Sequence, residues 1–250
     1  MTYCLALALD DGIVFASDSR SNAGSDYVTT YGKTHVFDLG PDRLFVIMTA
    51  GNLSTTQEVI NRLRRDVDAG DGRECLLSPD YLFEAAHMVG RVSLDVQEEH
   101  ARGFKRTGSK GGSATMIFGG QIGDKPSCIF LIYPEGNAIT VSAETPYLQI
   151  GESKYGKPIL DRLIHPGLSL ADGARLALVS LDATAKSNVT VGMPFDVSIY
   201  RHNSYELAPT QRFESDSVAY RSLNEHWSAG LAATFESLSE VVPNEGWELG

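Results

Sequence analysis

Three side chains within the first 33 residues could together carry nucleophilic chemistry. Thr2 follows Met1, so removal of Met1 would leave a residue with a free α-amine beside its side-chain hydroxyl. Such a residue holds both a nucleophile and its own general base. An ordinary start to a chain is the alternative explanation of Thr2, and the charged residues that follow help to decide between the two.

Asp18 and Lys33 are the charged residues that would complete this site. The unperturbed pKa of an α-amine is about 8, and a neighbouring ammonium lowers it because it disfavours a second positive charge. Lys33 would then keep the Thr2 amine unprotonated, and Asp18 would hold Lys33 charged and in place. A plain salt bridge between Asp18 and Lys33 is the alternative interpretation.

Two apolar segments at the start of the chain predict a hairpin that brings Thr2 close to Asp18. Residues 3–9 alternate large and small side chains, residues 13–17 are apolar, and the sequence between them is Asp-Asp-Gly, which favours a turn. With a three-residue loop, Thr2 opposes Arg20 and lies diagonal to Asp18 on the same face, about 7 Å away between backbones. A two-residue loop shifts this pairing by one.

The remaining pattern indicates an α+β fold. The predicted elements are a hairpin at 34–39 and 43–49, helices at 54–67 and 79–100, strands at 113–118, 127–133 and 138–142, helices at 155–164 and 169–186, a strand at 195–201 and a helix at 219–240. Because the strands are apolar on both faces, we expect two sheets between two helix layers, a four-layer αββα sandwich. We expect one domain over 1–250, with a C-terminal helical extension from about 215 to 250, since no linker or repeat divides the chain.

Composition limits the partners and ligands. The 250 residues carry a net charge of −11, which repels phosphate backbones, so we expect no nucleic-acid partner. No apolar run is long enough to span a bilayer and no secretory signal is recognisable, which predicts a cytoplasmic protein without a membrane partner. The three cysteines are widely spaced and the six histidines lack zinc-type spacing, so we expect no metal and no cofactor.

The sequence around Asp18 resembles that of proteasome β-subunits. Residues 16–24 (Ala-Ser-Asp-Ser-Arg-Ser-Asn-Ala-Gly) look like the family's Ala-Asp-Ser-Arg-Ala-Thr-Ala-Gly stretch, and the spacing from Thr2 to Asp18 matches the family's. Lys33 lies one residue before the expected place of the family's lysine. Residues 49–52 (Thr-Ala-Gly-Asn) resemble the segment that supplies its oxyanion-hole amide. The Met-Thr-Tyr start and the long C-terminal extension look like the bacterial Anbu branch, and HslV is a more distant likeness.

The resemblance implies an N-terminal nucleophile hydrolase, a threonine-type endopeptidase that cleaves peptides or unfolded proteins within a homo-oligomeric ring or spiral. It leaves any unfolding partner unknown. It implies that Thr2 is nucleophile and base, that Asp18 and Lys33 tune its amine, and that the Gly51 N–H stabilises the oxyanion. The substrate channel would be lined by Arg20, Asn22 and Gly24, where an extended peptide adds as a strand, and the pocket for the side chain before the cut by Thr49 and Leu53.

Two segments depart from the family's pattern. Its Gly-Ser-Gly turn is replaced by Gly-Glu-Ser-Lys at 151–154, where Ser153 is a candidate substitute for the supporting serine and an ordinary loop serine is the alternative. Its Asp-x-x-Ser-Gly-Gly motif becomes Ser-Asn-Val-Thr-Val-Gly at 187–192, without the acidic member. Two further functions therefore remain open: an amidohydrolase of the same fold that acts on a small amide, and a catalytically weak scaffold.

Overall fold

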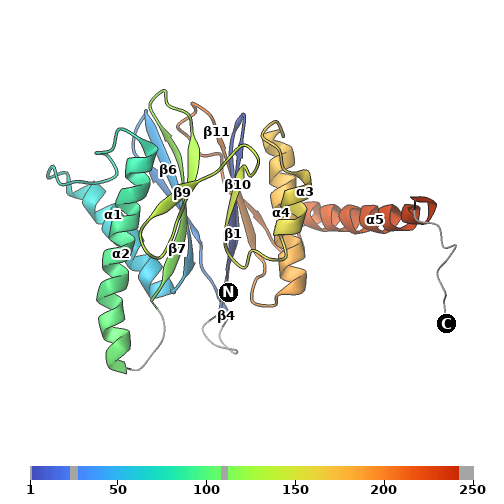
Figure 1. Ribbon diagram of the computed structural model, residues 1–250, viewed down its shortest axis with the longest axis horizontal. Helices are drawn as coiled ribbons and strands as arrows, with labels where there is room; N and C mark the ends of the chain where they lie inside the picture. Colours follow the sequence, from blue (N-terminus) through green and yellow to red (C-terminus); the bar gives the residue numbers. More distant parts are fainter. Residues whose placement is uncertain (1, 23–27, 108–111, 242–250) are drawn as a thin grey trace. The chain divides into compact units, whose positions relative to one another are not determined.

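Two five-stranded antiparallel sheets lie face to face between two layers of helices (Figure 1). The computed structural model describes residues 2–22, 28–107 and 112–241. These form two compact units, a core unit Met1–Phe213 and a C-terminal unit Glu214–Gly250. The layers of the core unit confirm the predicted αββα sandwich.

The first sheet has the strand order β10-β1-β2-β11-β12 and the second β5-β6-β7-β8-β9. The first contains β1 (Tyr3–Leu9), β2 (Gly12–Asp18), β10 (Tyr147–Gly151), β11 (Phe195–Arg201) and β12 (Gln211–Phe213). The second contains β5 (Thr34–Asp38), β6 (Arg43–Gly51), β7 (Ala114–Ile122), β8 (Cys128–Ile132) and β9 (Ala138–Thr140). A separate ribbon pairs β3 (Arg20–Asn22) with β4 (Val28–Thr30).

Helices cover the outer face of each sheet (Figure 1). The second sheet is covered by α1 (Leu53–Ala69) and α2 (Leu82–Thr107), and the first by α3 (Lys157–Leu163) and α4 (Leu170–Ser187). The C-terminal unit contains α5 (Val218–Val241). Within the described ranges, none of the helices combines the length and apolar character that a membrane span needs.

Strand β1 is buried on both faces, which explains its unbroken apolar sequence. Cys4 and Ala6 face the sandwich interior, where they belong to a cluster with Val46 and Ile117 of the second sheet. The alternate residues face α4, where Tyr3 bonds to that helix. Thr2 therefore begins a strand whose position is set by both neighbouring layers.

The turn between β1 and β2 contains two residues, so the three-residue register is wrong. Leu9 pairs with Gly12, and Cys4 pairs with Ser17 instead of Asp18. Continuing this register places Tyr3 beside Asp18 and removes the predicted diagonal placement of Thr2 and Asp18 on one face. The physical reason lies on the other side of β2. Gly12 pairs with Arg201 of β11, and a Cβ at Gly12 would lie 2.0 Å from the carbonyl oxygen of Tyr200.

Three edge elements were not indicated by the sequence pattern: β10, β12 and the β3–β4 ribbon. Each is five residues or shorter, and each becomes a strand because a neighbouring strand offers its backbone hydrogen bonds. The predicted helix at 79–100 instead runs over Leu82–Thr107.

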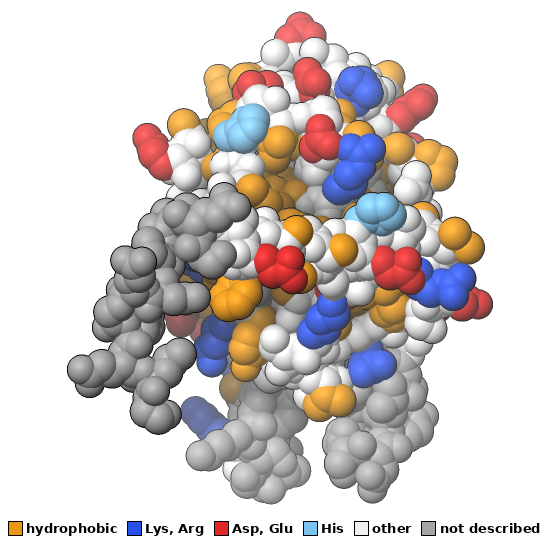
Figure 2. Space-filling view, turned by 90° about the vertical axis from the view of Figure 1, so that its right-hand side faces the viewer, with side chains coloured by type: hydrophobic (Ala, Val, Ile, Leu, Met, Phe, Trp, Pro, Cys, Tyr) orange, Lys and Arg blue, Asp and Glu red, His pale blue; other side chains and the backbone are white. Residues whose placement is uncertain are grey.

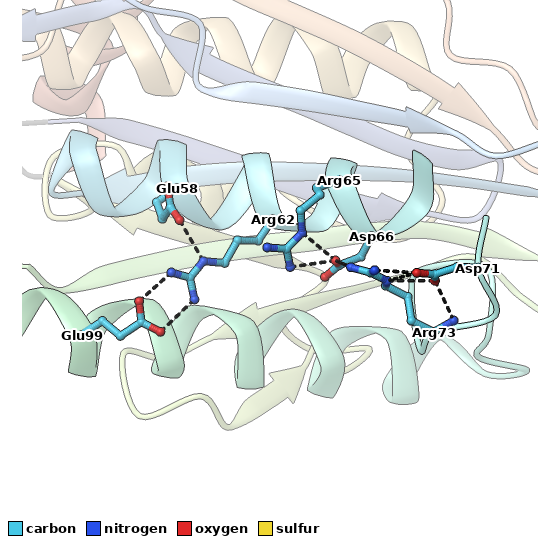
Figure 3. A network of polar contacts seen from close by, with 7 residues as sticks. All are labelled: Glu58, Arg62, Arg65, Asp66, Asp71, Arg73 and Glu99. Carbon is cyan, nitrogen blue, oxygen red and sulfur yellow. Dashed lines mark hydrogen bonds and ion pairs between the residues drawn. The ribbon is translucent and has the colours of Figure 1, made fainter. Parts of the chain in front are cut away.

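The outer surfaces of the helices carry paired charges. Figure 3 shows Arg62 of α1 between Glu58, at 2.9 Å, and Glu99 of α2, at 2.6 Å. Arg73 bridges to Asp66 of α1 at 3.1 Å. Acidic and basic side chains are likewise interspersed on the face drawn in Figure 2. Exposed pairs of this kind contribute about 0–1 kcal/mol each, so they add little to the stability of the fold.

Candidate active site

A buried ion pair joins the two sheets beside the start of β1. Asp18 ends β2, Lys33 directly precedes β5, and the Lys33 Nζ lies 2.5 Å from the Asp18 Oδ1. The two side chains are 6% and 0% exposed. Lys33 also donates to the Arg20 carbonyl oxygen at 2.8 Å. The structure therefore brings together the two charged residues selected from the sequence.

The Asp18 carboxylate also accepts two backbone hydrogen bonds. The Tyr3 N–H donates to Oδ1 at 2.9 Å and the Gly192 N–H to Oδ2 at 3.3 Å. Burial raises the pKa of Asp18, and the Lys33 ammonium and these two N–H groups oppose that rise. Both carboxylate oxygens are thus held by fixed donors, which sets the position of the Lys33 charge.

The peptide group that follows Thr2 is held from both sides. Its carbonyl oxygen, on Thr2, accepts from the Glu152 N–H at 2.7 Å, and its N–H, on Tyr3, donates to Asp18. Gly151 allows this close approach, because a Cβ there would lie 1.9 Å from the Thr2 carbonyl oxygen. Thr2 is half-buried. Its backbone is therefore held beside the Asp18–Lys33 ion pair. Met1 lies outside the described residues.

Tyr3 anchors this strand start to α4, a role that the sequence analysis missed. Its hydroxyl bonds to the Ser180 Oγ at 2.7 Å and accepts from the Gln149 Nε2. Burial raises the pKa of Tyr3 well above its ordinary value, so the phenol stays neutral. The only signal in the sequence was a hydroxyl-bearing aromatic residue in an otherwise aliphatic strand.

The proposed oxyanion donor and pocket residues come from the end of β6 and the start of α1. Gly51 has φ +117° and a Cβ there would lie 2.4 Å from the Ser113 carbonyl oxygen, so the backbone conformation and the packing both require glycine. The Thr49 N–H donates to the Lys33 carbonyl oxygen at 3.0 Å. Leu53, the first residue of α1, is 39% exposed.

The remaining predicted site residues are Arg20, Asn22, Gly24 and Ser153. The Arg20 Nη1 donates to the Val189 carbonyl oxygen at 2.9 Å, so this side chain holds the 188–192 segment. Asn22 is described only through its backbone pairing with Val28, and Gly24 lies outside the described residues. Ser153 is half-buried, and its carbonyl oxygen accepts from a backbone N–H at the start of α3. Among the described residues, no cluster of His, Cys, Asp and Glu is placed to hold a metal ion.

Comparison with known proteins identifies the fold. A family model described as "Proteasome subunit" matches residues 2–200, a range that includes the site from Thr2 to Gly192. The chain belongs to the proteasome subunit family. This confirms the resemblance seen around Asp18. A comparison with curated proteins gives no match.

The solved structures place the chain with the Anbu members of this family. It is 40% identical to the Pseudomonas aeruginosa protein of "Helical Assembly of the Anbu Complex", with TM-score 0.88 over 94% of this chain and 96% of that one. It is 36% identical to "Anbu (ancestral beta-subunit)" from Yersinia bercovieri, with TM-score 0.87 over 99% of both chains. It is 37% identical to Anbu from Hyphomicrobium sp. strain MC1, with TM-score 0.83 over 94% and 97%.

Proposed function

We propose that the protein is a threonine-type endopeptidase that cleaves peptide bonds through an acyl-enzyme on Thr2, after removal of Met1. The observation that carries this proposal is the buried Lys33 ammonium, held on an Asp18 carboxylate that also accepts the N–H directly after Thr2. A fixed positive charge at this place disfavours protonation of a free Thr2 amine and so lowers its pKa. The amine can then act as a base near neutral pH.

The reaction follows from these groups. The Thr2 Oγ1 attacks the carbonyl carbon of the scissile peptide bond, and the Thr2 amine accepts the hydroxyl proton. The Gly51 N–H donates to the oxyanion that forms. The protonated amine then gives its proton to the departing amine, which leaves an ester on Thr2. Water hydrolyses this ester, with the same amine as base, and restores the hydroxyl.

The substrate contacts are part of the same proposal. Arg20, Asn22 and Gly24 would border an extended peptide, Thr49 and Leu53 would shape the pocket for the side chain before the cut, and Ser153 would support Thr2. The backbone hydrogen bond between Thr49 and Lys33 favours this arrangement, because it places the pocket residue directly beside Lys33.

Mass spectrometry and mutagenesis test the peptidase directly. Intact mass should show the loss of Met1, and an epoxyketone, which reacts with the hydroxyl and the amine of an N-terminal Thr, should add to the mature chain. Thr2→Ala should lower cleavage of a peptide library at least about a thousandfold, and Thr2→Ser, which keeps a hydroxyl, should retain part of it. Retention of Met1, or equal activity of Thr2→Ala, would reject the proposal.

Two other functions are alternatives to the endopeptidase. The exchange of the family's acidic motif at 187–192 favours a catalytically weak scaffold, for which Thr2→Ala would change no measured function. An Ntn-fold amidohydrolase would use the same Thr2 chemistry on a small amide. Digestion of the peptide library alongside a panel of small amides separates it from an endopeptidase, because cleavage of small amides alone would favour it.

We further infer that the protein works as a homo-oligomer, a ring or spiral in the cytoplasm that encloses its sites. The support is the helical assembly named for the Pseudomonas aeruginosa relative. In α5, apolar residues recur every three or four positions at Tyr220, Leu223, Trp227 and Leu231, a spacing suited to subunit contact. Truncation before Val218, which removes these residues, and truncation after Phe235, which removes only the end of the chain, should each change the assembly in a sizing measurement. An unchanged assembly would exclude a role for the segment that was removed. Trp247 lies outside the described residues.

A further inference from the structure

The segment at 188–192, between α4 and β11, contacts the site at three positions. The Val189 carbonyl oxygen accepts from Arg20, whose own carbonyl oxygen accepts from Lys33. The Gly192 N–H donates to the Asp18 Oδ2 at 3.3 Å. The third contact is at the start of the segment, where the Asn188 Nδ2 donates to the Glu152 Oε2 at 2.9 Å. The segment thus contacts Asp18, Arg20 and Glu152, which surround the start of β1.

Asn188 is oriented by its own loop. Its Oδ1 accepts from the Thr190 N–H at 3.0 Å and from the Thr190 Oγ1 at 2.6 Å, which leaves its NH₂ group to face Glu152. Its backbone N–H donates to the Thr184 carbonyl oxygen at 2.8 Å, so it also ends α4. A shift of the Asn188 side chain would therefore move the loop that carries Gly192.

Glu152 connects this loop to Thr2. Its side chain accepts from Asn188, and its backbone N–H donates to the Thr2 carbonyl oxygen at 2.7 Å. The residue is only 8% exposed. A carboxylate buried to this degree needs a donor, and Asn188 supplies one. One residue therefore holds the Thr2 backbone and the start of the 188–192 segment together.

We propose that Glu152 is a positioning residue for Thr2 chemistry: through Asn188 it keeps the Gly192 N–H on Asp18 while its own N–H holds Thr2. It supplies, from the 151–154 turn, the acidic group that the 187–192 segment lacks. This inference rests on the proposed function, because positioning matters only if Thr2 reacts.

Variants that exchange donor and acceptor between Asn188 and Glu152 test the role of their hydrogen bond. Glu152→Gln keeps an oxygen that accepts from Asn188, so kcat should stay within about threefold of the wild type. Asn188→Asp keeps the acceptor for Thr190 but sets two carboxylates against each other, so kcat should fall on the order of tenfold or more. In the double variant the Gln amide donates to the new Asp, and kcat should return to within about threefold. Glu98→Ala, which removes an exposed carboxylate from α2, is the control and should leave kcat unchanged.

Two measurements separate positioning from a general loss of structure. The rates are normalised to the sites that an epoxyketone titrates, so unfolded chains do not count, and KM should change less than twofold. A fall in kcat for Asn188→Asp that the double variant does not recover would overturn the inference. So would a normalised kcat equal to that of the wild type in Asn188→Asp.

A readout without catalysis keeps this inference apart from the peptidase proposal. The rate at which formaldehyde and cyanoborohydride methylate the Thr2 amine, followed against pH by mass spectrometry, reports its surroundings. Asn188→Asp should shift this profile and the double variant should restore it. If the wild type shows no cleavage but the profile shifts and recovers, the peptidase proposal fails, while the Glu152–Asn188 contact is still shown to set the surroundings of the Thr2 amine. If the wild type cleaves and the profile of Asn188→Asp matches that of the wild type, the positioning role fails alone.

Discussion

Replacement of Lys33 by Met tests whether the Asp18–Lys33 pair is as buried as the structure has it. The Met side chain fills similar space without charge, so the carboxylate would remain in a site where its side chain is 0% exposed. Removal of one partner of a buried ion pair costs about 3–5 kcal/mol, because the other charge is left without compensation. A chain of this length loses about 2–4 °C in Tm for each kcal/mol. We therefore expect Tm to fall by roughly 6–20 °C.

The loss of stability caused by Lys33→Met should also increase as pH rises. Burial already raises the pKa of Asp18, and loss of the ammonium raises it further. Between the unfolded value near 4 and the raised folded value, the folded variant binds more protons than the unfolded chain, so its stability falls as pH rises. Urea unfolding of wild type and Lys33→Met at one protein concentration should show the smallest difference near pH 4 and the largest near neutrality.

The chain offers a matched control in Lys157, which pairs with Asp161 at 2.8 Å. These side chains are 52% and 46% exposed, so Lys157→Met should cost less than about 1 kcal/mol and show little dependence on pH. Equal effects of the two substitutions, or a Lys33→Met deficit that is constant from pH 4 to 8, would refute the reasoning.

Two more predictions concern stability. Gly51→Ala should lower the free energy of unfolding by about 1–3 kcal/mol, since an Ala there has an unfavourable φ and meets the Ser113 carbonyl oxygen. The control is Gly103→Ala, which lies in open space on α2 and should not destabilise the protein. An unchanged urea midpoint for Gly51→Ala would contradict the prediction. Burial, and after it the positive charge of Arg64, lower the pKa of His35 to about 4 in the folded protein. The unfolded chain therefore binds a proton at His35 below about pH 6.5 while the folded protein does not, and the stability present above that pH is lost as pH falls towards 4. His35→Gln should flatten that part of the stability curve measured by urea unfolding, and identical curves would exclude His35 as the cause.

Local features of the chain were enough to predict the fold class. The alternation in residues 3–9 and the apolar strands that follow are properties of neighbouring residues, and strands that are apolar on both faces require covering layers. The αββα sandwich is confirmed for this reason. The proteasome family, which is also confirmed, was predicted from the resemblance of the residues around Asp18. The spacing of Thr2, Asp18 and Lys33 likewise selected the two residues of the buried ion pair.

The register of β1 on β2 was beyond the sequence, because the Asp-Asp-Gly turn allows two loop lengths. Pairing of Gly12 with β11 decides between them, and β11 lies at the other end of the core unit's sequence. The strand β10 was missed for a similar reason, since its five residues become a strand by pairing with β1.

The chain by itself thus determined the main helices, the longer strands and the charged residues near Thr2, because these depend on neighbours in sequence. Tertiary structure alone decided how Thr2 is held. The Glu152 N–H on its carbonyl oxygen, the Tyr3 hydroxyl on α4 and the Gly192 N–H on Asp18 all join segments that are distant in sequence. No local pattern encodes such contacts, because they exist only once both sheets and α4 have packed together.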